Sequence, residues 1–168
     1  MIPPGVHYSL RIPSQTDNLE LIRNFVSGVA RKVGFRDVDI SKIELSVDEA
    51  CTNVIEHAYR GRARKDIGVA VKIDCDKLVI VVTDRGRGFN FRDVGMPDMK
   101  TYLAELRVGG LGIYLMKTLM DEVEYHSAPG KKNEVRMVKY LLKKNVKQKE
   151  RSLASVRSGA RSARQKTA

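Results

Sequence analysis

Two polar residues, one helical turn apart, are the first candidates for chemistry in this chain. Glu49 and Asn53 are four positions apart, so on a helix they share one face. A carboxylate can take a proton from a hydroxyl nucleophile, and an amide oxygen can join the shell of a Mg²⁺ ion that holds phosphates. An amide does not titrate, so only Glu49 can be the base. The spacing alone favours an ordinary solvated face, and Glu49 and Asn53 are expected roughly opposite the apolar side of the helix.

A second motif follows a strand-like run and contains Asp84, Gly86 and Gly88. An aspartate at a strand end can accept a hydrogen bond from an exocyclic amine such as that of adenine. Glycines two and four residues later let the backbone approach a flat ring closely, or adopt positive φ. A plain Asx turn that leaves a strand gives the same pattern, so this motif alone leaves both interpretations open.

The third motif, Gly109-Gly110-Leu111-Gly112, precedes an apolar run with helical spacing. Glycine-rich backbone at a helix N-terminus directs several N–H groups to one place, where the helix dipole also favours negative charge. This combination predicts a phosphate site. Its glycine spacing differs from those of the Walker P-loop and of the dinucleotide-binding fold, and a flexible loop that ends at a helix cap remains the alternative.

The succession of these three motifs resembles the N, G1 and G2 boxes of the GHKL ATPases, over roughly residues 8–142. Within that superfamily, residues 49–59 and 110–123 are similar to the anti-sigma-factor serine-protein kinases of bacteria. The resemblance implies a kinase that uses ATP and Mg²⁺ to phosphorylate a serine or threonine of a STAS-type antagonist protein. It also implies a partner-switching regulator of transcription, which sequesters a sigma factor when unphosphorylated antagonist is scarce.

The same resemblance implies roles for individual residues. Glu49 would be the general base, Asn53 the Mg²⁺ ligand and Asp84 the acceptor for the adenine amino group. Residues 91–108 would form an ATP lid. Relatives often have a threonine near the start of the final strand, where this chain has Asn133, so the resemblance assigns no contact there. The nucleotide pocket would be completed by Gly86, Gly88, Gly109, Gly110, Leu111 and Gly112.

Hydrophobic periodicity predicts the elements that must position these residues. We expect an α+β fold, a two-layer sandwich of the GHKL (Bergerat) type, with a mixed sheet and helices on one face. Thr16 or Asp17 is expected to cap the first helix and Asp39 the second. In chain order, the predicted elements are a strand at 6–12, helices at 19–33 and 39–59, strands at 67–73 and 78–83, a helix at 113–120, and strands at 123–127 and 134–142.

Most of the net charge of +11 belongs to the C-terminal segment. Nine Lys or Arg residues and one acid, Glu150, lie from Lys143 onward, so we expect a kinase domain at 1–142 and a basic, disordered tail at 143–168. The tail could bind an acidic surface, and nucleic acid could bind only there, although no aromatic residue offers a stacking platform. No apolar run is long enough to span a membrane. Cys51 and Cys75 lack CxxC spacing and indicate packed, reduced thiols in a cytoplasmic protein.

Two other classes of protein compete with the kinase. A GHKL-fold switch could bind ATP or a partner without transferring phosphate, although the presence of both Glu49 and Asn53 argues against it. The catalytic half of a histidine kinase needs a phosphoacceptor histidine on a dimerisation helix, and we expect no room for one before residue 13. The resemblance allows a homodimer without requiring one.

Overall fold

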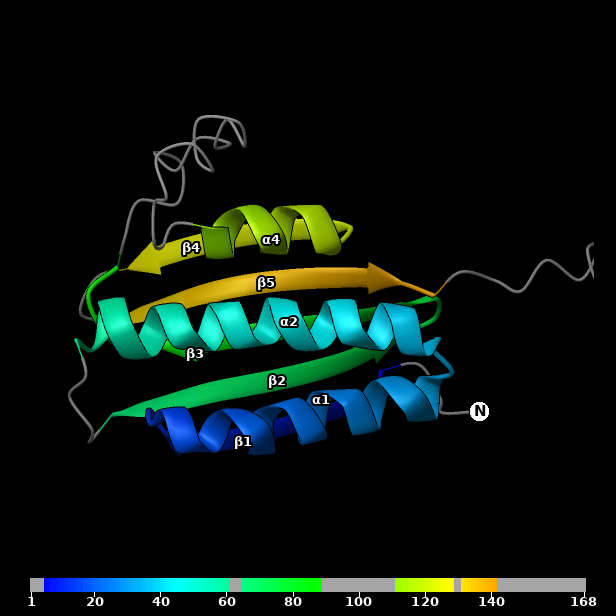
Figure 1. Ribbon diagram of the computed structural model, residues 1–168, viewed down its shortest axis with the longest axis horizontal. Coiled ribbons are helices and arrows are strands. Elements are labelled where there is room, and N and C mark those ends of the chain that lie inside the picture. The colour runs from blue at the N-terminus through cyan, green and yellow to red at the C-terminus, as the bar shows by residue number, and fades with distance from the viewer. Residues whose placement is uncertain (1–4, 61–64, 89–110, 129–130, 142–168) are drawn as a thin grey trace, which may run out of the picture.

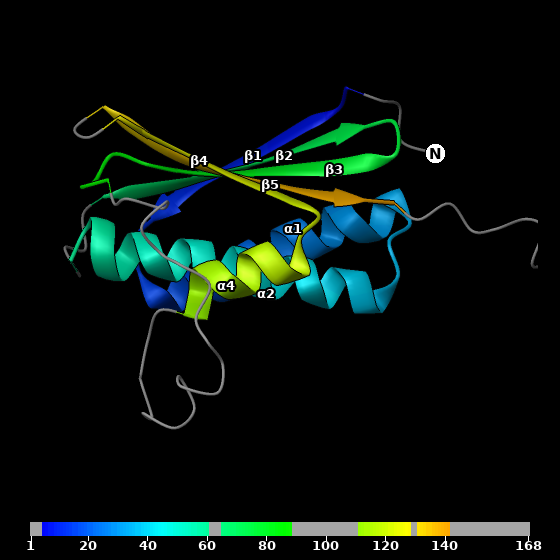
Figure 2. The same ribbon diagram turned by 90° about the horizontal axis from the view of Figure 1, so that it is seen from above.

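A five-stranded sheet is covered on one face by three helices (Figures 1 and 2). The computed structural model describes residues 5–60, 65–88, 111–128 and 131–141. The two-layer α+β prediction is therefore confirmed. The elements are β1 (His7–Pro13), α1 (Leu19–Val33), α2 (Asp37–Asn53), β2 (Asp66–Asp74), β3 (Lys77–Asp84), α4 (Leu111–Leu119), β4 (Glu122–Ala128) and β5 (Lys132–Tyr140).

The strands lie in the order β1-β2-β3-β5-β4, and all four neighbouring pairs are antiparallel. The expectation of a mixed sheet is wrong. The chain crosses from β3 through α4 to β4, which makes these two strands parallel, but β5 turns back and inserts between them. Because β5 is antiparallel to both neighbours, the described strands form no parallel pair.

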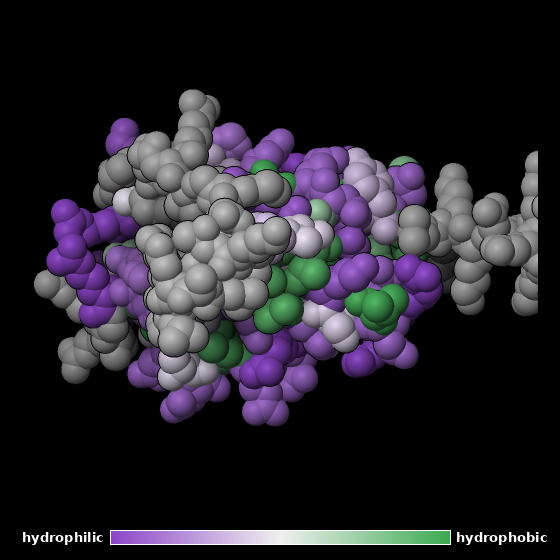
Figure 3. Space-filling view, turned by 45° about the horizontal axis from the view of Figure 1, so that its top comes forward, coloured by the Kyte–Doolittle hydropathy of each residue, from purple (hydrophilic) through white to green (hydrophobic). Residues whose placement is uncertain are grey.

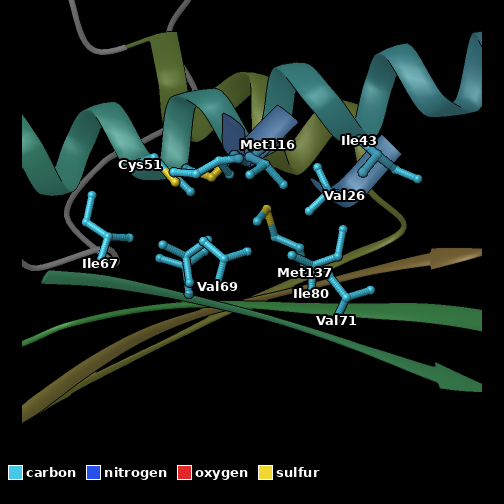
Figure 4. Close-up of a cluster of buried hydrophobic side chains, with 14 of the residues drawn as sticks. Val26, Ile43, Cys51, Ile67, Val69, Val71, Ile80, Met116 and Met137 are labelled. Atoms are coloured by element: carbon cyan, nitrogen blue, oxygen red, sulfur yellow. The ribbon is translucent and has the colours of Figure 1, made fainter. Parts of the chain in front are cut away.

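Alternating burial along the strands explains why one face of the sheet takes the helices. In β2, Ile67, Val69, Val71 and Ile73 are buried at every second position, as a strand with one covered face requires. Figure 4 shows Ile67, Val69 and Val71 pointing from the sheet toward the helices, with Met116 of α4 and Met137 of β5 between the two layers. A continuous hydrophobic core between the sheet and the helices thus positions the elements that carry the candidate site.

The first two helices begin differently from the prediction. A 3-10 turn (Thr16–Asn18) precedes α1, whose N-cap is Asn18, and no side chain caps either helix with a hydrogen bond. Asp39 is not a cap, because α2 starts two residues earlier and Asp39 accepts a hydrogen bond from Arg36 Nε at 2.9 Å. The predicted end of α1 is confirmed, since Gly34 adopts a left-handed conformation with φ of 99°.

A π-helical turn (Val54–Ala58) extends α2 toward the predicted end near Tyr59. Tyr59 N–H donates to the carbonyl of Val54, five residues earlier, at 3.0 Å. Such widened turns occur often at functional sites. Here the turn directly follows Asn53 and ends at Ala58. Asn53 and the backbone of Ala58 both belong to the candidate site described below.

The C-terminus of α4 is anchored to the sheet by a buried lysine. Lys139 of β5 is 7% exposed and donates through Nζ to the carbonyl of Leu119 at 2.8 Å and to Asp121 Oδ1 at 3.0 Å. An ammonium group at a helix C-terminus satisfies orphan carbonyls and complements the helix dipole. This anchor fixes one end of α4, while its other end faces α2.

The described surface in Figure 3 is mainly hydrophilic, with hydrophobic side chains in small separate groups. In the described part of the chain, no helix has the length and apolar character needed to cross a membrane. Cys51 is buried, as expected, but the packing role expected for Cys75 is wrong, because Cys75 is exposed in the β2–β3 turn. The basic tail at 143–168 lies outside the described residues and stays a prediction.

Candidate functional site

The sequence predicted that Glu49 and Asn53 lie on a face opposite the core, where they would be open to solvent. In the structure they lie instead against the first turn of α4. A Cβ atom placed on Gly112 would lie 2.5 Å from Glu49 Oε2 and 3.4 Å from Asn53 Nδ2. Both side chains are only partly exposed. The fold therefore brings the first and third sequence motifs together, and glycine at position 112 leaves room for the two polar groups.

Asp48 and Glu49 are adjacent carboxylates with different surroundings. Asp48 faces α1, where its Oδ2 pairs with Arg23 Nε at 3.2 Å. Glu49, one position on, faces α4 through its proximity to Gly112. Only Glu49 therefore faces the turn at which the sequence predicts phosphate binding.

The electrostatic setting of Glu49 suits a proton acceptor. Burial is the main effect that raises the pKa of the Glu49 carboxyl above its ordinary value of 4.5, and the negative charge of Glu56 adds to it. Within the described ranges, no cation forms an ion pair with Glu49. A carboxylate with a raised pKa and no bound cation is a better base than a salt-bridged one.

The amide of Asn53 has the features expected of a ligand-binding group. Its Nδ2 atom is buried and has no hydrogen-bond partner among the described residues. Buried polar groups are nearly always paired, so this N–H donor fits a bound acceptor such as a phosphate oxygen, whereas a metal ion would be bound by the amide oxygen, Oδ1. The described residues contain no cluster of three His, Cys, Asp or Glu side chains that could hold a metal by themselves. A Mg²⁺ ion at Asn53 would thus depend on phosphate oxygens for further ligands, as this ion commonly does.

Asp84 is the last residue of β3 and belongs to a polar row that crosses three strands. The row runs from Asp84 to Asn133 in β5 and on to Ser127 in β4, each directly opposite the next. Asn133 Nδ2 donates to Asp84 Oδ1 at 2.9 Å and to the Gly86 carbonyl at 3.1 Å, and Ser127 Oγ donates to Asn133 Oδ1 at 3.0 Å. The backbone N–H of Gly86 also donates to Asp84 Oδ1, at 2.7 Å, which confirms an Asx turn.

The turn after Asp84 packs against the end of the helix that contains Glu49. Arg87 N–H donates to the carbonyl of Ala58 at 3.1 Å. A Cβ atom on Gly86 would lie 2.5 Å from that same carbonyl oxygen and 2.8 Å from the Ala58 Cβ. Gly86 is therefore required by a close backbone approach, and the second motif is joined to the first through the π-helical turn.

Tyr59 supports this junction from the other side. Its hydroxyl accepts a hydrogen bond from Arg85 N–H at 2.8 Å and donates to the carbonyl of Asp66 at 3.0 Å. Burial is the largest influence that raises the pKa of the Tyr59 phenol, which keeps it protonated and able to donate. The phenol thus links the strand that ends at Asp84 to the start of β2.

A hollow of about 290 Å³ also lies at this end of the sheet, where Asp84 and Tyr59 contribute to its lining. Its strand residues include Gly68 and Thr83, which alternate with core residues and so belong to the helix-free face. Neither Glu49, Asn53 nor Gly112 lines it. The walls are formed by Arg11, Tyr59, Lys65, Asp66, Gly68, Thr83, Asp84, Arg85 and Lys132.

Comparison with known proteins identifies the family of this chain. The model of the histidine kinase-like ATPase domain matches residues 12–139 of the chain. The chain belongs to the histidine kinase-like ATPase family. The match runs from the end of β1 to Lys139 in β5 and includes every described residue of the candidate site.

Relatives that are similar to this chain in sequence are serine-protein kinases, which specifies the class of enzyme within this ATPase family. The chain is 38% identical over 143 residues to the serine-protein kinase RsbW of Bacillus pumilus, covering 82% of this chain and 87% of the relative. For the serine-protein kinase RsbW of Bacillus subtilis the identity is 34% over 139 residues, covering 80% and 86%. For that of Listeria monocytogenes it is 32% over 151 residues, covering 88% and 95%. These matches confirm the predicted family and the protein serine/threonine kinase class.

A solved structure shares the fold of this ATPase domain. The RsbU and RsbW domains of a Mycobacterium tuberculosis protein align with a TM-score of 0.59 at 15% identity, covering 82% of this chain and 32% of that chain. At this identity the likeness shows the fold alone. It supports the sandwich architecture and adds nothing about individual residues.

Some predicted site residues lie outside the described part of the chain, namely Gly109, Gly110 and the lid at 91–108. Leu111 and Gly112 form the first turn of α4, whereas the predicted helix began only at residue 113. The sequence did not reveal what Asn133, Ser127 and Tyr59 do. The signal for Asn133 and Ser127 was strand register, because pairing the last three strands places both residues in line with Asp84.

Proposed function

We propose that this chain is a cytoplasmic kinase that transfers the γ-phosphate of ATP to a serine or threonine of a STAS-type antagonist protein. We further propose that it binds a sigma factor when unphosphorylated antagonist is scarce. The main supporting observation is the approach of Glu49 and Asn53 to Gly112 at the start of α4. It puts a candidate base and a candidate metal ligand beside the turn that is suited to phosphate.

Each residue in this proposal has one task. Glu49 accepts the proton of the attacking hydroxyl, and its raised pKa suits that step. Asp84 Oδ2, which has no hydrogen-bond partner among the described residues, accepts from the adenine amine. Bound Mg²⁺ would neutralise charge on the phosphates, with Asn53 as its protein ligand. Backbone N–H groups of the motif from Gly109 to Gly112 bind the phosphates, and Gly86 and Gly88 allow close approach of the nucleotide.

The test is phosphate transfer by the full chain. The protein is incubated with γ-labelled ATP, Mg²⁺ and the STAS-type proteins encoded in the same genome, and labelled positions are mapped by mass spectrometry. We expect label on one serine or threonine of one antagonist, and none when Mg²⁺ is chelated. ATP binding without transfer to any of them would favour the non-catalytic switch, and failure to bind ATP would contradict the proposal altogether.

Partner binding is measured separately. A pull-down from native extract, with and without ATP, followed by phosphosite mapping, identifies the bound proteins. We expect a sigma factor and an antagonist whose proportions change with nucleotide. Deleting residues 143–168 serves as the control for binding through the basic tail, because only tail-mediated binding would be lost with it and would weaken steeply with salt.

A further inference from the structure

The polar row next to Asp84 has a consequence for nucleotide choice. Asn133 is completely buried, with 0% exposure, and its amide has a partner at both ends. Its nitrogen serves two acceptors, Asp84 Oδ1 and the Gly86 carbonyl, while its oxygen accepts from the Ser127 hydroxyl. These three hydrogen bonds fix which end of the amide faces Asp84, because a flipped amide would oppose two acceptors with an oxygen.

A fixed amide in turn fixes the carboxylate. Asp84 Oδ1 accepts from both Asn133 Nδ2 and Gly86 N–H, so this oxygen is engaged. The other oxygen, Oδ2, has no hydrogen-bond partner within the described residues. Because a carboxylate only accepts hydrogen bonds, a carboxylate held in this way presents one acceptor in a set direction. It matches the 6-amino group of adenine and is mismatched with the 6-oxo group of guanine.

Gly88 preserves the space for this arrangement. A Cβ atom at Gly88 would overlap Ser127 Oγ and would lie 3.0 Å from Asn133 Oδ1. A side chain there would therefore push on the two residues behind Asp84 before it could reach a nucleotide. Gly88 is thus required by its packing against the hydrogen-bonded row.

We propose that Asn133, braced by Ser127, is a positioning residue that holds Asp84 so that the site selects a purine with a 6-amino group. The inference rests on the proposed function, because it assumes that Asp84 meets the base. Asn133 itself does not touch the nucleotide. Its effect is confined to the part of the binding energy that comes from the amine.

Because the effect is limited to the contribution of the amine, it can be tested with a thermodynamic cycle. The cycle combines one substitution in the protein with removal of the amino group from the nucleotide. Kd is measured for ATP and for purine riboside triphosphate, which lacks the 6-amino group, with the full-length chain and its Asn133→Ala variant. A hydrogen bond to a charged group is worth enough that its loss should raise the Kd for ATP roughly tenfold or more. The Kd for purine riboside triphosphate should stay the same.

Matched variants separate positioning from general damage. Val135→Ala removes a buried side chain two residues along the same face of β5 without touching Asp84, so it should lower stability and leave the preference for ATP over the analogue intact. Asn133→Thr keeps one hydroxyl that can donate to Asp84, and we expect it to retain most of that preference. Ser127→Ala should reduce it by less than Asn133→Ala.

The outcomes are distinct. Equal losses for ATP and for the analogue in Asn133→Ala, or no loss for either, would overturn the inference, because a merely structural residue acts on both ligands alike. If Asn133→Ala fails to fold, the comparison of Asn133→Thr and Ser127→Ala with the unchanged chain decides the matter in the same way. A wild-type chain that binds neither nucleotide would instead refute the proposed function.

Discussion

Gly112 lies so close to Glu49 that a methyl group on the glycine would be 2.5 Å from Glu49 Oε2. The next nearest atom to such a methyl group is Asn53 Nδ2, at 3.4 Å. Both contacts are with the ends of side chains and not with backbone. The helix α4 therefore approaches α2 through a space that only glycine leaves open, and the two candidate catalytic groups occupy its far side.

Gly112→Ala should reduce phosphotransfer strongly while leaving stability nearly unchanged. The added methyl group displaces the flexible Glu49 carboxylate from the phosphate turn, and misplacement of a catalytic group by about 1 Å can cost on the order of a hundredfold in rate. Replacing a helical glycine by alanine gains about 0.5–1 kcal/mol, which offsets the local strain. The rate of antagonist phosphorylation and the thermal midpoint, measured together, check both parts.

Gly28→Ala is the matched control, because Gly28 lies within α1 and nothing approaches a Cβ there within 4 Å. It should stabilise the protein by about 0.5–1 kcal/mol and leave the rate unaltered. Equal rates for Gly112→Ala and Gly28→Ala would show that Glu49 does not need its observed position.

Gly86→Ala should behave differently from Gly112→Ala, since its Cβ would meet the backbone carbonyl of Ala58 at 2.5 Å. Backbone at the end of a helix cannot move aside as a side chain does, so overpacking should cost about 1–3 kcal/mol in the free energy of unfolding. The Asx turn at Asp84 should shift with it and weaken ATP binding. Urea denaturation and calorimetric titration of ATP measure the two effects, and a variant as stable as the parent would contradict this packing.

Tyr59→Phe should destabilise the chain by about 1–3 kcal/mol, because it leaves Arg85 N–H and the carbonyl of Asp66 without their shared partner. The ring and its packing are preserved, so the loss reports the hydroxyl alone. Tyr8→Phe is a suitable comparison, since Tyr8 lies on the edge strand β1. Indistinguishable unfolding midpoints for the two variants would mean that the hydrogen bonds of the Tyr59 hydroxyl contribute nothing to stability.

Most of the fold follows from patterns that the sequence displays openly. Alternation predicted β2 and β3 to within one residue at each end, and the apolar spacing together with Gly34 predicted α1 and its end. Sheet order was harder, because the insertion of β5 between β3 and β4 depends on contacts between distant segments. That long-range pairing is why the sheet is antiparallel and not mixed.

The candidate site likewise combines features that local sequence predicts with features that depend on contacts between distant segments. Glu49, Asn53 and Asp84 could be selected because helical spacing and a strand-end aspartate are local signals. The burial of Glu49 and Asn53 against α4 could not, since helical periodicity describes one helix and ignores what packs on its polar face. Asn133 is similar: its position near the start of the last strand was noted, but its hydrogen bond to Asp84 requires the register of β3 against β5.

Glu49→Gln should abolish phosphotransfer and retain ATP binding, because the amide keeps the shape of the side chain but cannot accept the proton. In the parent chain the rate should fall as pH falls through the pKa of Glu49, which burial holds above 4.5. The same shift has a consequence for stability. A carboxyl whose pKa is raised by folding favours the folded state most below its unfolded pKa and loses that contribution as pH rises through the folded pKa. Glu49→Gln should therefore melt at a higher temperature than the parent at neutral pH.

Asp48→Asn is the control that makes the Glu49 result specific. The pKa of Asp48 is also raised, mainly by burial and against the opposing charge of Arg23, but its carboxylate faces α1. Loss of that charge should change the dependence of stability on pH and leave the phosphotransfer rate within a few-fold of the parent. Since both variants remove one half-buried carboxylate from the same helix, a general electrostatic effect would slow them alike. Only a base positioned at the phosphate turn predicts that Glu49→Gln is inactive while Asp48→Asn still labels the antagonist.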